Sequence, residues 1–161
     1  MYSQSIALQL GTNASRMQAN TEFELLLIRG LRHCYLSRFI GSRDQLLNLE
    51  EIQKQLTIQS RNPAGIRLVP IAAICGSEGR SSDFDAKFRP LKRHCEERWV
   101  SIALAHQLEV GLPAVELIQI NDRYFVRDGH HRISVARWLG QLEIEAHVTV
   151  WHVNQPDGMH A

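Results

Sequence analysis

The sequence predicts an α+β fold in which a helical hairpin precedes a small domain built on a mixed sheet. Two stretches with apolar residues at helical spacing lie in the first third of the chain, over 21–39 and 45–56. After residue 66, short runs of β-forming residues alternate with two further helical patterns, at 96–109 and 130–140. Two consecutive helices followed by a region that includes a β-hairpin are typical of α+β proteins.

Length and charge limit the classes of protein to consider. The chain has 161 residues, of which 44% are hydrophobic, enough for one main core and a small appended element. The formal net charge is +1 and the pI is near 7.8, so composition indicates no broad basic field for wholesale binding of nucleic acid.

Cysteines and hydropathy indicate the compartment. The three cysteines are odd in number and widely spaced, which argues against a disulfide framework or a structural zinc site. No apolar run approaches the roughly 18 to 20 residues of a membrane span, and the N-terminus lacks the basic start of a signal peptide. We therefore expect a cytoplasmic protein with no membrane partner.

The N-terminal region is expected to contain an arm and the helical hairpin. Residues 1–20 are rich in Ser, Asn and Gln, which predicts a flexible arm. Thr21 and Glu24 form a capping-box pattern at the start of a helix that runs to about Phe39. A second helix follows Asp44, over 45–56, and completes a hairpin within 21–60 that packs on the main domain or on a second subunit as a homodimer.

Three arginines on the first predicted helix raise the question of a DNA partner. Arg29, Arg32 and Arg38 have the charge needed to line a nucleic-acid backbone. A solvated helix face explains them more simply, because Glu22 and Glu24 lie close by and no aromatic residues are interleaved with them.

The main domain is predicted to span 66–153, after a turn or linker at 61–65, with a tail over 154–161. A strand over 66–75 opens it, and Pro70 implies an edge position or a bulge. A helix over 96–109, a hairpin of strands 114–120 and 123–127, and a closing strand over 144–151 follow. The hairpin delivers its second strand directly into the segment 124–140.

The loop after the first strand concentrates charged side chains where functional groups often gather. Arg80 is suited to neutralise phosphate, and Glu78 to hold a metal ion or accept a proton. Asp83 and Asp85 are explained well by turn positions alone.

The segment Tyr124 to Gly140 carries the strongest functional pattern, a strand that passes through Asp128-Gly129-His130-His131-Arg132 into a helix. Asp128 is a candidate N-cap, and Gly129 permits a tight turn and the close approach of a ligand. The first free amides of the helix attract anions, and two imidazoles and a guanidinium add donors for phosphate oxygens. The pattern predicts a phosphate or nucleotide site.

Two other interpretations of this segment stay open. Asp128, His130 and His131, with His147 and His152 on the next strand, are all metal-ligand types, but adjacent histidines on a helix point about 100° apart. No protein-held metal site is therefore expected. Alternatively the groups are structural, with Asp128 capping the helix and pairing with Arg132 one turn on.

The order of elements and the motif together resemble the ParB/sulfiredoxin superfamily. The resemblance covers about Leu68 to Trp151 and rests on P-x-x-x-L-x-x-I-N-D-x-Y-x-V-x-D-G-H-H-R-x-x-x-A-x-x-x-G. In that superfamily the corresponding helix start binds the phosphates of ATP or CTP, and D-G-H-H-R is most similar to free-serine-kinase-like members. The resemblance implies Mg²⁺ with ATP or CTP as cofactor. It implies nucleotide-binding roles for Arg80, Asp128, Gly129, His130, His131 and Arg132.

Two departures narrow the implied function. Sulfiredoxin acts through a cysteine where this chain has His130, so repair of oxidised peroxiredoxin is disfavoured. ParB reads DNA through a helix-turn-helix placed after its nucleotide domain, whereas this sequence ends shortly after Trp151. We expect a small-molecule kinase or nucleotide hydrolase with Glu78 and His130 as candidate catalytic residues. The alternative is a non-catalytic, nucleotide-switched and DNA-associated protein of the partition type.

Overall fold

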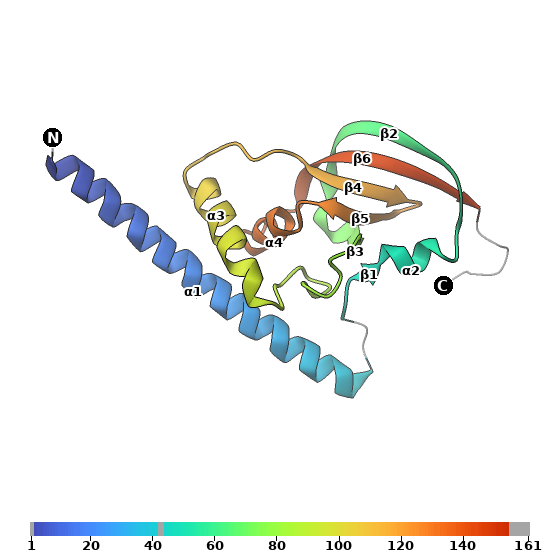
Figure 1. Cartoon of the computed structure of the whole chain (residues 1–161), viewed down its shortest axis with the longest axis horizontal. Coiled ribbons are helices and arrows are strands. Elements are labelled where there is room, and N and C mark those ends of the chain that lie inside the picture. The colour runs from blue at the N-terminus through green and yellow to red at the C-terminus, as the bar shows by residue number, and fades with distance from the viewer. Residues whose placement is uncertain (1, 42–43, 155–161) are drawn as a thin grey trace.

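The fold is known from a computed structural model, which describes the backbone of residues 2–41 and 44–154 and the side chains from residue 13 onward. Figure 1 shows the arrangement of its helices and strands. In chain order they are α1 (Tyr2–Ile40), β1 (Leu47–Asn48), α2 (Leu49–Gln53), β2 (Thr57–Pro70), η1 (Ile71–Ala73), β3 (Ile74–Ser77), η2 (Arg93–Cys95), α3 (Glu96–Gln107), β4 (Val115–Ile120), β5 (Arg123–Asp128), α4 (His130–Trp138) and β6 (Glu143–Asn154).

The strands form one six-stranded mixed sheet in the order β1-β3-β5-β4-β6-β2. Pairings β4–β5 and β2–β6 are antiparallel, whereas β1–β3, β3–β5 and β4–β6 are parallel. Parallel neighbours need crossover connections, and α3 and α4 lie in two of these. The α+β class expected from the sequence is confirmed.

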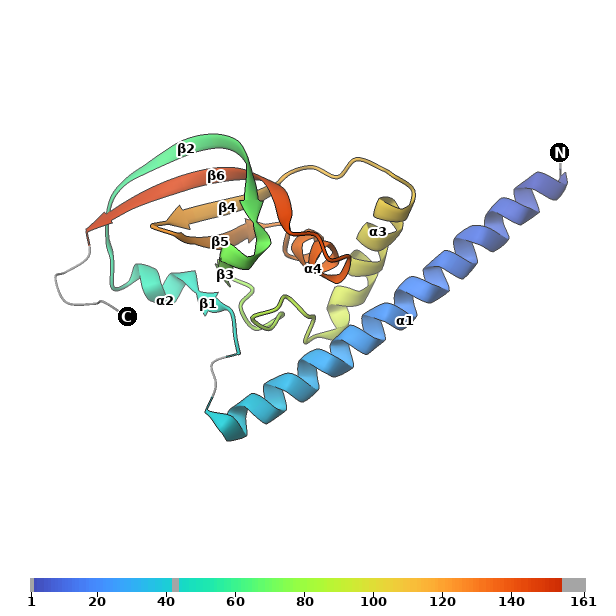
Figure 2. The ribbon, with the colours of Figure 1, turned by 180° about the vertical axis from the view of Figure 1, so that it is seen from behind.

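Helices cover the sheet unequally. Both views place α3 and α4 between α1 and the sheet, while the short α2 lies at the other end near β1 (Figures 1 and 2). The larger core cluster joins Phe23 of α1, Trp99 of α3 and Ile133 of α4 to the sheet, and all three side chains are fully buried. A smaller cluster around Phe125 and Trp151 fills the opposite face against α2.

The elements from α3 onward agree with the sequence-based expectation. The hairpin forms with Asn121 in the left-handed region at its turn, and α4 follows β5 after a single residue. The predicted helix at 96–109 and the closing strand at 144–151 correspond to α3 and β6. Each of these elements is specified by a local period and a local stop signal, so little depended on distant partners.

The expected flexible arm and the helix start at Thr21 are wrong. Residues 2–40 form one continuous helix, and the Thr21 hydroxyl donates back to the carbonyl of Met17, 3.0 Å away, instead of capping a new helix. Glu24 pairs with Arg93 of η2 and does not complete a capping box. The helix therefore begins well before the pattern that was interpreted as its start.

The second helix of the predicted hairpin is also wrong in extent. Only Leu49–Gln53 are α-helical, and Asn48, not Asp44, caps them by accepting from the Glu50 amide at 2.9 Å. Leu47 and Asn48 instead pair with β3, while the Asp44 carboxylate faces His33 and Arg89. Pairing with a distant strand has overridden the local helical spacing.

The predicted boundary at 61–65 falls inside β2. This strand runs along β6 from Thr57 to Pro70, with register shifts between Ile58 and Ser60 and between Pro63 and Ile66. Gly65 lies in the second irregularity with φ +75°. β2 is an edge strand, as Pro70 implied, and an edge tolerates residues that cannot donate to a ladder. The predicted tail at 154–161 lies almost wholly outside the described residues.

The outer face of α1 is apolar as well as basic. Leu31, Tyr35 and Phe39 are exposed on it. The homodimer expected through this region therefore depends on α1 alone and stays a prediction. Among the described residues, none of the helices combines the length and apolar character that crossing a membrane requires.

Candidate functional site at the start of α4

The site begins at Gly129, which connects β5 to α4. Its φ of +99° lies in the left-handed region, and a Cβ built there would stand 2.5 Å from Cγ1 of Val115. Any residue larger than glycine would meet both backbone strain and a clash with β4. The sequence-based expectation of a tight turn at this residue is confirmed.

Asp128 does not cap α4, contrary to our expectation. Gly129 occupies the N-cap position, and no side chain accepts a hydrogen bond there within the described structure. The Asp128 carboxylate instead pairs with the guanidinium of Arg132, as the structural interpretation proposed. The amides at the start of the helix are therefore not capped by the Asp128 side chain.

The Arg132 side chain is occupied by protein groups. Its NH1 donates to the carbonyl oxygens of Pro113, at 2.5 Å, and Ala114, at 2.9 Å, in addition to the bond with Asp128. The side chain is only 12% exposed. These contacts hold the segment before β4 against the start of α4, so Arg132 positions the site and does not offer a free fork to an anion.

The first amides of α4 are free of intrahelical partners. The first bond of the helix runs from the Ile133 amide to the Gly129 carbonyl, 3.0 Å away. The amides of residues 130, 131 and 132 precede it and point out of the helix end. With the helix dipole, they form a positive terminus of the kind that binds anions.

His130 is a buried link between α4 and β3. Its Nε2 lies 2.6 Å from the Ser77 hydroxyl, and its ring stacks on Phe84 with centroids 6.0 Å apart. The same Ser77 oxygen accepts the Arg80 amide at 3.1 Å, so one hydroxyl links His130 of α4 to the loop that carries Arg80. Sequence analysis missed Ser77, which is fully buried and is brought to His130 by the pairing of β3 with β5.

His131 carries the least satisfied polar group of the site. Its residue is 8% exposed, and within the described structure its Nε2 is buried without a hydrogen-bond partner. The ring meets Phe84 edge-on, with centroids 5.4 Å apart. A buried polar atom without a partner costs free energy, and functional sites are where such costs are usually tolerated.

Both imidazoles are held neutral. Burial, and then the positive charge of Arg80, lower the pKa of His130 to about 4 and the pKa of His131 to about 4. A neutral imidazole has one N–H to donate and one nitrogen to accept. A bound anion would offset the positive charge of Arg80, which would raise the pKa of both rings and favour their protonation.

Arg80 lies on the loop next to this helix start, as expected. Nε and NH2 of its guanidinium are each 2.9 Å from Oδ2 of Asp83, and its side chain is 36% exposed. Its guanidinium also lies 6.0 Å from the centroid of the Phe84 ring, which contacts both histidines. Arg80 is therefore a partly exposed cation close to His130 and His131, because all three side chains lie against the Phe84 ring.

Glu78 and Asp85 have other surroundings. The Glu78 carboxylate accepts from Nε of Arg127 at 2.9 Å, and Arg127 lines a cavity with Glu116, His147 and Thr149 on the sheet. Asp85 is fully buried and accepts from the amides of Lys87 and Arg89, which makes it a turn residue. The structure therefore groups Arg80 with the two histidines and pairs Glu78 with Arg127.

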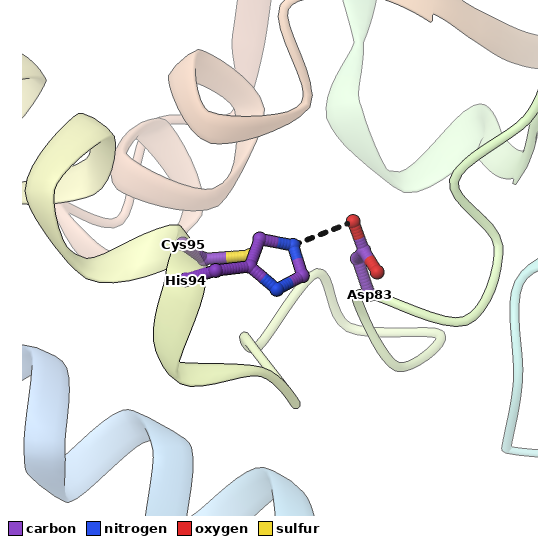
Figure 3. A group of neighbouring side chains, drawn as sticks. All are labelled: Asp83, His94 and Cys95. Carbon is purple, nitrogen blue, oxygen red and sulfur yellow. Dashed lines mark hydrogen bonds and ion pairs between the residues drawn. The ribbon is translucent and has the colours of Figure 1, made fainter.

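A second group of polar side chains lies beside Arg80 and escaped sequence analysis. Asp83, His94 and Cys95 place one potential ligand atom each within 4.8 Å of one another (Figure 3). Burial, and then Asp83, raise the pKa of the Cys95 thiol to about 11. No spacing rule could have found the group, because the loop between β3 and η2 must fold back to bring Asp83 to His94. It is the only such group among the described residues, and the ligand atoms of Asp128, His130 and His131 are not gathered in this way.

Comparisons with known proteins give a likeness to solved structures in part of the fold. No protein-family model matches the chain, and no curated protein is significantly similar to it. Among solved structures, the crystal structure of sulfiredoxin from Arabidopsis thaliana matches with 16% sequence identity and a TM-score of 0.37. The match covers 52% of this chain and 82% of that chain. It is a likeness in part of the fold and carries no evidence on activity.

Proposed function

We propose that the chain binds the phosphate groups of a nucleotide, ATP or CTP, at the N-terminus of α4. The observation that carries the proposal is the helix start itself, where free amides stand beside a buried imidazole nitrogen without a partner. Phosphate oxygens would accept from the amides of residues 130–132 and from His131. The choice of a nucleotide follows from the resemblance of the D-G-H-H-R segment to nucleotide-binding members of the ParB/sulfiredoxin superfamily.

Arg80 supplies the charge in this proposal. Its guanidinium is held by Asp83 and is partly exposed, so it can bind a phosphate without leaving its partner. Arg132, Asp128 and Gly129 act differently, because they fix the shape of the turn. His130 fixes the turn as well, since Ser77 already occupies its Nε2.

Magnesium fits the proposal as an ion bound through the nucleotide. Mg²⁺ keeps several water ligands and is usually held by substrate phosphates and one or two carboxylates. When bound, it would supply charge neutralisation between phosphates. The residues described above need only bind and orient the phosphates themselves.

The proposal is tested by calorimetric titration with ATP and with CTP, each with Mg²⁺. We expect saturable binding of one nucleotide, weakened at least about tenfold in Arg80→Gln because a charge-assisted bond is lost. Arg127→Gln is the matched control, since Arg127 faces the other cavity, and it should bind as the wild type does. The proposal is overturned if neither ATP nor CTP binds.

Catalysis is a separate question that the same protein can answer. If the chain transfers or hydrolyses a phosphoryl group through Glu78, Glu78→Gln should lose turnover and keep nucleotide affinity. The pairing of Glu78 with Arg127 instead favours a binding protein without turnover. We therefore propose nucleotide binding as the function, and kinase or hydrolase activity is the alternative that the Glu78→Gln comparison tests.

A further inference from the structure

We propose that Asp83, His94 and Cys95 form a binding site for a transition-metal ion of the zinc class. Asp83 comes from the loop after β3, His94 and Cys95 both come from η2, and the three side chains lie together in Figure 3. This site adjoins the proposed phosphate site, because Arg80 donates to Asp83, but its ligands and its test do not involve a nucleotide.

The separations fit a common ion. Zinc bonds of about 2.0 to 2.3 Å in tetrahedral geometry place ligand atoms about 3.3 to 3.8 Å apart. Nε2 of His94 lies 3.3 Å from Oδ2 of Asp83, and all three ligand atoms lie within 4.8 Å of one another. Small side-chain rotations would bring the set onto one ion.

The kinds of donor select the metal. A thiolate and an imidazole with one carboxylate are suited to Zn²⁺, Co²⁺ or Fe²⁺, whereas Mg²⁺ and Ca²⁺ prefer oxygen ligands alone. Binding would release the Cys95 thiol proton to water, since the thiolate is the ligand. The His94 side chain is 61% exposed, which gives an ion access and leaves a fourth position for water.

Arg80 supports the site from outside. It donates to Oδ2 of Asp83, and a carboxylate has enough lone pairs to accept from Arg80 and bind a metal at the same time. Ligating carboxylates are commonly oriented by such hydrogen bonds. Cys95 is fixed by burial in the core, so one rigid ligand and one supported ligand face the exposed His94.

Titration of the purified protein with Co²⁺ alone tests the site by absorption spectroscopy. We expect one equivalent to bind, with visible d–d bands of a low-coordinate site and a near-ultraviolet charge-transfer band from thiolate to cobalt. Addition of Zn²⁺ should remove both. Cys95→Ser should lose the charge-transfer band, whereas Cys75→Ser should keep it.

His94→Asn guards against misfolding of the cysteine variant, because His94 is exposed and its loss should leave the fold intact. This variant should bind Co²⁺ at least about tenfold more weakly. The proposal is overturned if the wild type shows no charge-transfer band, if the band survives in Cys95→Ser, or if His94→Asn binds as tightly as the wild type. None of these outcomes involves a nucleotide.

Discussion

At the scale of single residues, the site depends on one glycine. Gly129 and Gly140 flank α4 and both have positive φ, of +99° and +75°. A Cβ would meet Val115 at the first position and nothing within 4 Å at the second. We predict that Gly129→Ala lowers the free energy of unfolding by about 2 to 4 kcal/mol, against about 1 kcal/mol for Gly140→Ala.

Urea denaturation of both variants measures this difference. Equal losses would mean that the contact between Gly129 and Val115 is not a constraint, and the account of the turn would fail.

The two histidines make stability depend on pH. Their folded pKa values of about 4 lie below the unfolded value of 6.5, so the unfolded chain takes up protons first as the pH falls. The stabilisation is fully present above about pH 6.5 and declines toward pH 4, by about 1.4 kcal/mol per pH unit for each imidazole. Urea denaturation from pH 7.5 to 5 measures the slope, which should be shallower in His131→Asn. An unchanged slope would contradict the burial of His131.

The sequence predicted which residues belong to the site better than it predicted the groups that these residues contact. Turn chemistry is local, so the sequence sufficed for Gly129 and for the helix that follows it. Arg132 was expected to bind phosphate because its type suits that ligand, yet two carbonyls before β4 occupy it. Ser77 and the group around Asp83 could not be found, because strand pairing and a folded-back loop create those contacts.

At the scale of elements, α1 is an integral part of the domain. Phe23 is fully buried with its ring centroid 5.9 Å from that of Trp99 in α3. Phe23→Ala should therefore lower the free energy of unfolding by about 3 to 5 kcal/mol, as large-to-small core substitutions do. Tyr35→Ala, at an exposed position of the same helix, should change it by less than about 1 kcal/mol.

Chemical denaturation of the two variants distinguishes a docked helix from a loose arm. If Phe23→Ala is as stable as the wild type, α1 does not pack on α3 in solution, and the account of the larger core cluster fails.

The elements differ in how far local signals specify them. From α3 to β6, each period of apolar residues is confirmed as the helix or strand it predicts. Between residues 44 and 65, β1 and the first part of β2 take the place of the expected linker and of all but Leu49–Gln53 of the expected helix, since pairing with β3 and β6 outweighs helical spacing. Such competition is decided by strands far along the chain, and a local pattern carries no information on it.

At the scale of the whole molecule, the sheet and α4 together create the proposed phosphate site. β3 and β5 are neighbours and parallel, so the loop with Arg80 and the turn at Gly129 both follow the C-terminal ends of these strands and lie on the same side of the sheet. The expected partners outside the chain, DNA and a second copy, stay predictions. The outer face of α1 on which both depend combines exposed arginines with exposed Tyr35 and Phe39.

The central claim is that phosphate groups bind the free amides at the start of α4. The most direct measurement is an amide-resolved NMR titration with Mg²⁺ and the nucleotide, repeated with tripolyphosphate. The account predicts that the amides of His130, His131 and Arg132 shift most and saturably with both ligands, and that Arg80→Gln weakens both titrations. If these three amides stay in place while others shift, the phosphates bind elsewhere and the proposed site is wrong.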